Sequence, residues 1–311
     1  MRVLPGRLAD KPQYVFHPSR ALRRLMHGFT DTAGRREVTE LPWGLPLEVR
    51  ISDSIGFSIV AGRVFDPCVT ETLYRLIDPG DRVADVGANV GYLTSLAAVR
   101  AGRDGQVIAF EPHPQVYELL ERNAARWRNG AVDNVELHRV ALSDRRGEGT
   151  LVAGPSFEGN MGLASLSSDQ PTTTGAESIT VPLARLDETP GAERLDLLKI
   201  DVEGHEPDVL RGAERLLANG AVRDIVFEDH DEYPSAATSI VEAAGYELIS
   251  LDNDLRGLLL VAPKDRGKVR EWPGPSYLAT LDPERARQRL RPRGWQVRGI
   301  GPSLWPRRAR G

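Results

Sequence analysis

The chain has 311 residues, of which 27% are charged and 41% hydrophobic, the composition of an ordinary globular protein. This length suits one large domain with extensions or two small domains, and the net charge of −4 favours neither nucleic acid nor an anionic membrane as a partner. Cys68 is the only cysteine, so the chain cannot form an intramolecular disulfide, and we interpret Cys68 as a small packed residue.

The first fourteen residues are polar and charged, with no apolar run of the kind found in a signal peptide. No stretch approaches the run of about eighteen apolar residues that a membrane helix needs. We therefore expect a soluble, cytoplasmic protein that does not act on membranes.

Residues 1–64 are predicted to form an N-terminal extension. Residues 19–28 suit a helix, which would cap the site or an oligomer interface, although a frayed tail fits equally well, so a homo-oligomer stays open. Alternating side chains at 47–51 and 57–60 predict a β-hairpin with its turn at 53–56. A helix over 69–77 then leads into the main domain.

Strands and helices alternate through the main domain, residues 65–263. The pattern predicts strands at 82–86, 106–110, 135–142, 195–201, 224–228, 246–251 and 258–262, and helices at 92–100, 114–127, 207–219 and 235–244. Such alternation indicates an α/β, doubly wound and mostly parallel sheet with right-handed crossovers. The last strand follows its predecessor so closely that it should be an antiparallel edge strand.

Two segments break the alternation. Residues 152–178 are rich in Gly, Ser and Thr, and a loop of that length is usually functional or disordered, so a lid beside the ligand edge of the sheet is one interpretation. Residues 264–311 are rich in Arg and Pro, and we interpret them as a solvated C-terminal tail with one helix at 283–290.

A glycine-rich turn joins the strand 82–86 to the helix that follows it. Gly87, Asn89 and Gly91 all tolerate the backbone angles of a tight turn, so a ligand can lie against bare backbone at the start of a helix. Glu111 ends the next strand, where a carboxylate in a βαβ unit lies beside the ribose of a nucleoside. These residues predict a site for a nucleoside cofactor.

The spacing of the turn distinguishes between nucleoside cofactors. A dinucleotide site has three glycines in the order Gly-x-Gly-x-x-Gly, whereas this turn reads Asp85-x-Gly87-x-Asn89-x-Gly91. An acid at Asp85 would repel a pyrophosphate but could hold the ammonium of an amino acid. The turn resembles motif I of S-adenosylmethionine-dependent methyltransferases.

A second informative stretch runs from Leu197 to Glu206, where an apolar strand ends in a cluster of acids with one histidine. Capping of the following helix explains only part of this cluster. Asp-Val-Gly-Ala-Asn-Val-Gly, Phe-Glu-Pro-His-Pro and Lys-Ile-Asp-Val-Glu-Gly-His-Glu follow one another in this order. In these motifs, residues 65–262 resemble the FkbM family of methyltransferases.

The resemblance implies a seven-stranded class I methyltransferase fold and methyl transfer, commonly to a hydroxyl of a sugar or natural product. It implies that the methionine half of the cofactor is held by Asp85, Gly87, Asn89 and Gly91, and the ribose by Glu111. It also implies that adenine is bordered by Ala141, Leu142 and Ser143, assisted by Asp144. Asn160 and Gly162 match a family loop whose role we do not derive.

A hydroxyl acceptor must lose its proton near the transition state. His205 and His230, both at strand ends on the cofactor side, are candidate bases, although each could be a structural residue. Lys199 lies within its strand, and we expect its side chain to extend to the edge of the sheet rather than to take part in the chemistry.

A magnesium site is a further hypothesis. Asp201 ends one strand and Glu228 and Asp229 end the next, so three carboxylates could converge on Mg²⁺ beside the transferring methyl. Their spacing is similar to that in metal-dependent macrolide-sugar O-methyltransferases, although Gly204 stands where that group has a histidine. In the simpler alternative, Asp201 touches the cofactor while Glu228 and Asp229 bind loop amides.

Two other functions stay open. A nicotinamide-dependent oxidoreductase shares the half-sheet and the ribose acid but needs the pyrophosphate loop that this sequence lacks. A non-catalytic nucleoside-binding scaffold is the second alternative, because no single residue is assured as catalytic. The sequence predicts a small-molecule acceptor without identifying it.

Overall fold

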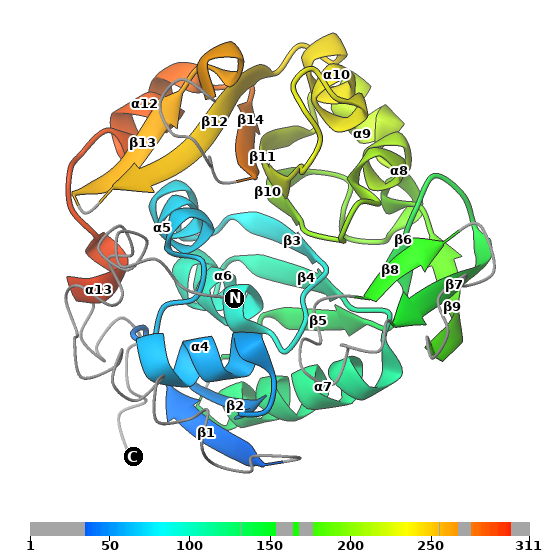
Figure 1. Ribbon diagram of the computed structural model, residues 1–311, viewed down its shortest axis with the longest axis vertical. Helices are drawn as coiled ribbons and strands as arrows, with labels where there is room; N and C mark the ends of the chain where they lie inside the picture. Colours follow the sequence, from blue (N-terminus) through cyan, green and yellow to red (C-terminus); the bar gives the residue numbers. More distant parts are fainter. Residues whose placement is uncertain are drawn as a thin grey trace, which may run out of the picture.

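The computed structural model describes residues 35–130, 132–153, 164–167, 177–254, 256–266 and 275–299. Its centre is an eight-stranded sheet with the strand order β13-β12-β14-β11-β10-β3-β4-β5 (Figure 1). The strands are β3 (Arg82–Val86), β4 (Gln106–Phe110), β5 (Val135–His138), β10 (Leu195–Ile200), β11 (Val222–Glu228), β12 (Glu247–Asp254), β13 (Gly257–Val261) and β14 (Ser276–Thr280).

The sheet is mostly parallel, as predicted. Strands β5, β4, β3, β10 and β11 pair in parallel, while β14 runs antiparallel to both β11 and β12. Strand β13 is the antiparallel edge strand expected at 258–262. The α/β, doubly wound fold is therefore confirmed, with one strand more than the seven implied.

Helices cover both faces of the sheet because alternate strand residues point to opposite sides. In β3, Val83 belongs to a core shared with α5 (Pro67–Leu76), α6 (Tyr92–Ala101), α7 (Pro114–Asn129) and α12 (Pro283–Leu290). Its neighbour Ala84 belongs to a second core, shared with α8 (Glu206–Arg211), α9 (Glu214–Ala218) and α10 (Ala236–Ala243). None of the helices in the described ranges is long and apolar enough to cross a bilayer.

The helix predicted over 207–219 is interrupted. It divides into α8 and α9 at Gly212, where an added Cβ would lie 2.0 Å from the carbonyl oxygen of Ser143. The chain passes too close to its neighbour at this point for a side chain, and the helix ends there. A short 3₁₀ helix, η2 (Leu186–Glu188), packs beside α9.

The predicted N-terminal hairpin is wrong. The residues expected as its first strand form β2 (Pro46–Arg50), but β2 pairs with β1 (Arg36–Glu40) in an antiparallel ribbon. The expected second strand is instead part of helix α4 (Ser54–Gly62). The Asp53 side chain accepts a 2.9 Å hydrogen bond from the Gly56 amide, an N-cap that starts the helix where a turn was expected. The helix expected at 19–28 lies outside the described residues.

A second, small sheet has the order β6-β9-β7-β8, with β6 (Ala141–Leu142), β7 (Gly147–Ala153), β8 (Ala164–Ser167) and β9 (Glu177–Ala184). The single strand predicted over 135–142 is thus two strands, β5 and β6, in different sheets. The expected lid at 152–178 is described in part, and that part belongs to this small sheet. Residues 154–163 and 168–176, including Asn160 and Gly162, lie outside the described residues.

The solvated tail predicted from residue 264 is wrong for residues 275–299, although the one helix expected in it, at 283–290, is confirmed as α12. All five residues of β14 are buried, and Tyr277 stacks on Phe227 with ring centroids 5.6 Å apart. After β14 come α12 and α13 (Gln296–Gly299), which contact α5, while a 3₁₀ helix, η3 (Pro263–Asp265), follows β13. The described C-terminal residues therefore complete the sheet instead of trailing from it.

Candidate active site

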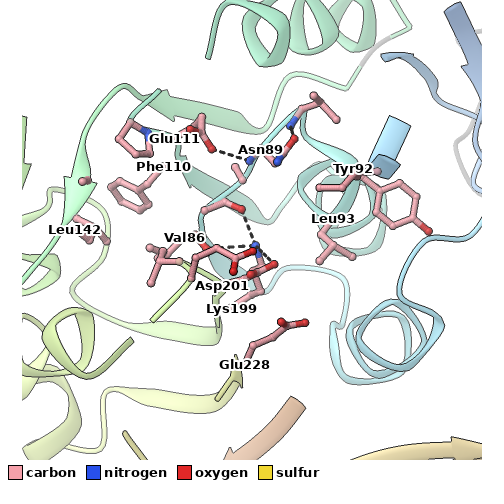
Figure 2. A pocket seen from close by; sticks show the side chains of 18 of the residues that line it. Val86, Asn89, Tyr92, Leu93, Phe110, Glu111, Leu142, Lys199, Asp201 and Glu228 are labelled. Atoms are coloured by element: carbon pink, nitrogen blue, oxygen red, sulfur yellow. Dashed lines mark hydrogen bonds and ion pairs between the residues drawn. The ribbon is translucent and has the colours of Figure 1, made fainter. Parts of the chain in front are cut away.

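A cavity of about 300 Å³ lies at the carboxyl ends of β3, β4, β10 and β11 (Figure 2). This volume is at the lower end of the range typical of ligand pockets. Three groups of residues line it, one from the loop after β3 with the end of β4, one from the small sheet, and one from the ends of β10 and β11 with α4. It lies at the sheet edge where open α/β folds bind their ligands.

The loop after β3 has the geometry that its sequence predicts. Gly87 has φ +75° and Asn89 has φ 51°, and an added Cβ on Gly87 would lie 1.9 Å from the Asp201 carbonyl oxygen. The amides of Gly87 and Ala88 donate to the Phe110 carbonyl at 3.0 and 2.9 Å. The loop is thereby fixed to β4, and its outer side faces the cavity.

Gly91 is the residue before helix α6, with φ +90°. An added Cβ there would lie 2.6 Å from Leu120 and 2.7 Å from Trp127, so glycine is also required by the packing of α7. Its role is to let the loop turn closely over α7.

Glu111 lines the cavity from the end of β4. Its two carboxylate oxygens accept hydrogen bonds from the amides of Asn89 (3.0 Å) and His113 (2.9 Å). Burial raises the pKa of Glu111 to about 7, although both amide hydrogen bonds act in the opposite direction. The Glu111 carboxylate thus faces the cavity from the end of β4, and its contact with a ribose stays a prediction.

Asp85 does not line the cavity. It is buried beneath the loop, where it accepts a 2.6 Å hydrogen bond from the Thr94 hydroxyl and lies 3.1 Å from the Lys199 ammonium. The sequence suggested that Asp85 contacts the ammonium of the cofactor's methionine half. In the structure, Asp85 instead supports the loop from below.

The residues expected at the adenine separate into two pairs. Ala141 and Leu142 line the cavity together with Phe110. Ser143 and Asp144 are absent from the cavity lining, and the buried Ser143 hydroxyl donates to Asp144 at 3.2 Å. The apolar pair alone, with Phe110, offers a surface for a flat ring.

His205 is likewise absent from the cavity lining. Its Nε2 lies 3.0 Å from the Ser143 hydroxyl and its Nδ1 lies 3.2 Å from the Asp208 carboxylate. Burial lowers the pKa of His205, although Asp208 acts in the opposite direction. The ring links the loop after β6 to helix α8.

Three acids line the cavity at the ends of β10 and β11, namely Asp201, Glu203 and Glu228. Burial, followed by the charge of Asp201, raises the pKa of Glu228 to about 8 and also raises that of Glu203. His230 is 67% exposed at its side chain, and its Nε2 lies 3.8 Å from a carboxylate oxygen of Glu228. We name Asp201, Glu203 and Glu228 the acidic rim.

The structure does not support the magnesium site. The Asp229 carboxylate accepts hydrogen bonds from the Asp231 amide (3.0 Å) and the Ser235 hydroxyl, so it is engaged within its own loop. In the described part of the chain, no group of three His, Cys, Asp or Glu side chains is arranged to hold a metal ion. The loop contact of Asp229 fits the simpler alternative.

One wall of the cavity was missed by sequence reasoning. It consists of Ser54, Ile55 and Ser58 from α4, with Phe65 after it. The Tyr92 hydroxyl, at the start of α6, accepts a 3.1 Å hydrogen bond from the Phe65 amide. The N-cap Asp53 was the available signal, because it marks a helix that brings this segment to the site.

The model of one protein family, described as "Methyltransferase FkbM domain", matches residues 85–248, which is more than half of the 311-residue chain. Over 201 residues, 54% of this chain, the sequence is 32% identical to the AMB antimetabolite synthetase AmbE of Pseudomonas aeruginosa, a match that covers 9% of that protein. It is 27% identical over 198 residues to the hexuronic acid methyltransferase AglP of Haloferax volcanii, covering 60% of this chain and 72% of AglP.

Over 181 residues the chain is 32% identical to the 31-O-demethyl-FK506 methyltransferase FkbM of Streptomyces tacrolimicus, covering 49% of this chain and 66% of that protein. Among solved structures, a methyltransferase FkbM from Methylobacillus flagellatus is similar to 64% of this chain and 43% of its own, with a TM-score of 0.41 and 12% identity. A structural similarity at that TM-score carries no weight for the family of this chain, which the match to the FkbM domain over residues 85–248 establishes. The chain belongs to the FkbM family of methyltransferases.

Proposed function

We propose that this protein transfers a methyl group from S-adenosylmethionine to a hydroxyl oxygen of a sugar or a natural product. The observation that carries the proposal is the cavity itself, which joins the loop after β3 and Glu111 to the acidic rim. One end has the features of a nucleoside site and the other carries groups able to accept a proton, so cofactor and acceptor can meet in one cavity.

The residues present fit this cofactor. Glu111 would bind the ribose, Phe110, Ala141 and Leu142 would contact the adenine, and the loop residues 87–90 would border the methionine half, while Gly91 packs on α7 outside the lining. The acidic rim suits a cationic ligand, whereas a pyrophosphate would be repelled there. When bound, S-adenosylmethionine supplies a methyl group already activated on a sulfonium.

The chain's own task is to align the acceptor, to exclude water and to hold the acceptor's proton. Among the groups lining the cavity, we propose Glu228 as the proton acceptor, with Asp201 orienting the acceptor hydroxyl. His230, beside Glu228, would pass the proton to solvent. His205, bonded to Ser143 and Asp208 and absent from the cavity lining, is better suited to hold the loop after β6 against α8 than to act as the base.

Two features support a hydroxyl-rich acceptor. Ser54 and Ser58 on α4 lie in the same cavity as the acidic rim, so the acceptor region carries hydrogen-bonding groups on more than one side. Two relatives are named as methyltransferases of a hexuronic acid and of 31-O-demethyl-FK506.

The test uses S-adenosylmethionine carrying a ¹³C-methyl group, incubated with the protein and fractions of small molecules bearing hydroxyl, carboxyl or amine groups. The methyl carbon shift in the product separates oxygen, nitrogen and sulfur acceptors, and mild base hydrolyses methyl esters but not ethers. We expect a base-stable methyl ether, and no product with Glu111→Ala. A base-labile ester or an N-methyl product would overturn the hydroxyl assignment, and binding of NAD in place of S-adenosylmethionine would overturn the function.

A further inference from the structure

Lys199 lies beneath the cofactor loop at the base of the cavity, which it helps to line, and its ammonium contacts backbone carbonyls as well as carboxylates. It is the second-last residue of β10 and pairs in register with Asp85 on β3, so the two side chains project from the same face of adjacent parallel strands. The Lys199 and Asp85 side chains are 5% and 2% exposed. A charge at this depth is retained only if it is fully paired.

The Lys199 ammonium lies 2.7 Å from the Gly87 carbonyl oxygen and 3.2 Å from that of Val86 (Figure 2). It also lies 3.1 Å from an Asp85 carboxylate oxygen and 3.7 Å from one of Asp201. Val86 is the last residue of β3 and Gly87 the first of the loop, so both carbonyls stand at the point where the strand turns over the cavity.

Electrostatics keep the amine charged in this position. Burial opposes the charge, but the carboxylates of Asp85 and Asp201 outweigh it and raise the pKa of Lys199 above its usual range. A charged ammonium carries three N–H donors and no acceptor, which matches two carbonyls and a carboxylate. The Thr94 hydroxyl holds the other oxygen of Asp85 at 2.6 Å, so the carboxylate is fixed from its far side.

The loop is therefore held on both sides of its peptide groups. Its amides at Gly87 and Ala88 are bonded to the Phe110 carbonyl, and its carbonyls at Val86 and Gly87 are bonded to Lys199. Without Lys199, the amide contacts would remain and the Val86 carbonyl would keep the Asp201 amide as a donor at 3.1 Å, while the Gly87 carbonyl would lose its Lys199 donor.

We propose that Lys199 is a positioning residue for methyl transfer, which holds the turn at Val86 and Gly87 in the shape that receives S-adenosylmethionine. This inference rests on the proposed function, because it takes the loop after β3 as the methionine end of the cofactor site. A loop that adopts its binding shape one time in ten would weaken the apparent affinity about tenfold.

The competing explanation is that Lys199 only neutralises Asp85 inside the fold. Two variants separate these roles. Lys199→Met keeps an unbranched side chain, one atom shorter, but removes all donors, and it leaves the Asp85 charge buried. The double variant Lys199→Met/Asp85→Asn removes both charges and keeps an oxygen able to accept from Thr94.

The measurements are the unfolding temperature and the dissociation constant for S-adenosylmethionine by calorimetry. We expect Lys199→Met to lower both stability and affinity. The double variant should recover most of the unfolding temperature, yet still bind S-adenosylmethionine at least about tenfold more weakly than the wild type, because the Gly87 carbonyl still lacks the Lys199 donor. If Lys199 only neutralised Asp85, the double variant would recover both its stability and its affinity toward the wild-type values.

Two controls complete the test. Thr94→Val removes the other support of Asp85 without touching the carbonyls, so it should lower the unfolding temperature and leave affinity unchanged. Lys264→Met makes the same substitution at an exposed lysine in η3 and should change neither.

The proposal would be overturned if the double variant bound S-adenosylmethionine as tightly as the wild type. It would also be overturned if neither Lys199 variant folded, because Lys199 would then serve the fold alone. Wild-type protein that does not bind S-adenosylmethionine would overturn the proposed function and this inference with it. Wild-type binding that survives intact in the double variant would overturn the inference alone.

Discussion

The backbone amide of Asn89 donates a 3.0 Å hydrogen bond to a carboxylate oxygen of Glu111, which ties the loop after β3 to the end of β4. The other carboxylate oxygen accepts from the His113 amide at 2.9 Å. Each oxygen of an ionised carboxylate has a second lone pair, so both can still accept a hydrogen bond from a ribose hydroxyl. Glu111 can thus shape the loop and hold the cofactor at once.

Substitution of Glu111 by Gln should weaken S-adenosylmethionine binding by about 1.5–3 kcal/mol, the range for a hydrogen bond to a charged group. The amide has one oxygen where the carboxylate has two, so one backbone amide or one ribose hydroxyl loses its acceptor. Calorimetry measures the change, with Glu118→Gln at an exposed carboxylate of α7 as the matched control. Unchanged affinity in a folded Glu111→Gln protein would remove Glu111 from the site.

The affinity for S-adenosylmethionine should also depend on pH through Glu111. Because burial raises the pKa of this carboxyl to about 7, it is largely protonated at pH 6 and ionised at pH 8. Only the ionised form presents two acceptors, so affinity should rise with pH, by about tenfold between pH 6 and pH 8. The dissociation constant measured from pH 6 to 8 tests this, and Glu111→Gln should flatten that dependence.

The local patterns of the sequence were sufficient for the centre of the fold. The predicted bounds of β3 and β4 agree with the structure because both are short apolar runs buried on two faces between clear turns. The same holds for Gly87 and Glu111, whose places follow from one strand–turn–helix–strand unit. These features depend on neighbours in sequence, which a pattern can show.

Features that depend on distant partners were missed. Strand β14 is five residues long and owes its place to β11 and β12, on either side of it, while its Arg- and Pro-rich surroundings suggested a tail. The run Phe57–Val60 suits a strand or a helix, and the Asp53 cap decides for the helix. His205 follows a strand end, as predicted, but its contacts with Ser143 and Asp208 arise only in the folded chain.

Glu228→Gln should lower kcat by about 10²–10⁴-fold, the usual contribution of a general base, while the dissociation constant for S-adenosylmethionine changes little. The measurement uses the acceptor found by ¹³C-methyl labelling. In the wild type, kcat/KM should rise with pH toward about 8, because burial and the charge of Asp201 raise the pKa of Glu228 to that value and only its ionised form accepts a proton.

His230→Gln, beside Glu228, is the comparison for that experiment. An exposed relay can be replaced by water, so its loss should cost far less than the loss of Glu228. If Glu228→Gln turned over as fast as the wild type, or showed the same pH dependence of kcat/KM as the wild type, another group would be the proton acceptor.

The last prediction concerns how the C-terminal segment is fastened to α5. Arg75 and Glu71 form an ion pair of 2.6 Å, with side chains 2% and 0% exposed. The Arg75 guanidinium also donates to the carbonyls of Pro292 (2.6 Å) and Gly294 (2.7 Å), and Glu71 accepts from the Gln296 amide (2.8 Å). The pair therefore holds the chain after α12 against the helix that leads to the site.

Arg75→Met should lower the free energy of unfolding by about 3–5 kcal/mol, because it leaves a buried carboxylate without its cation and removes the Arg75 donors from four backbone carbonyls. Urea titration measures the loss, and limited proteolysis should show earlier cleavage after α12. Arg293→Met is the matched control: its exposed pair with Asp254, at 3.4 Å, should contribute no more than about 1 kcal/mol. Equal, small losses in both variants would mean that the segment is held by the apolar contacts of β14 and α12, and that the Arg75–Glu71 pair only occupies the space between them.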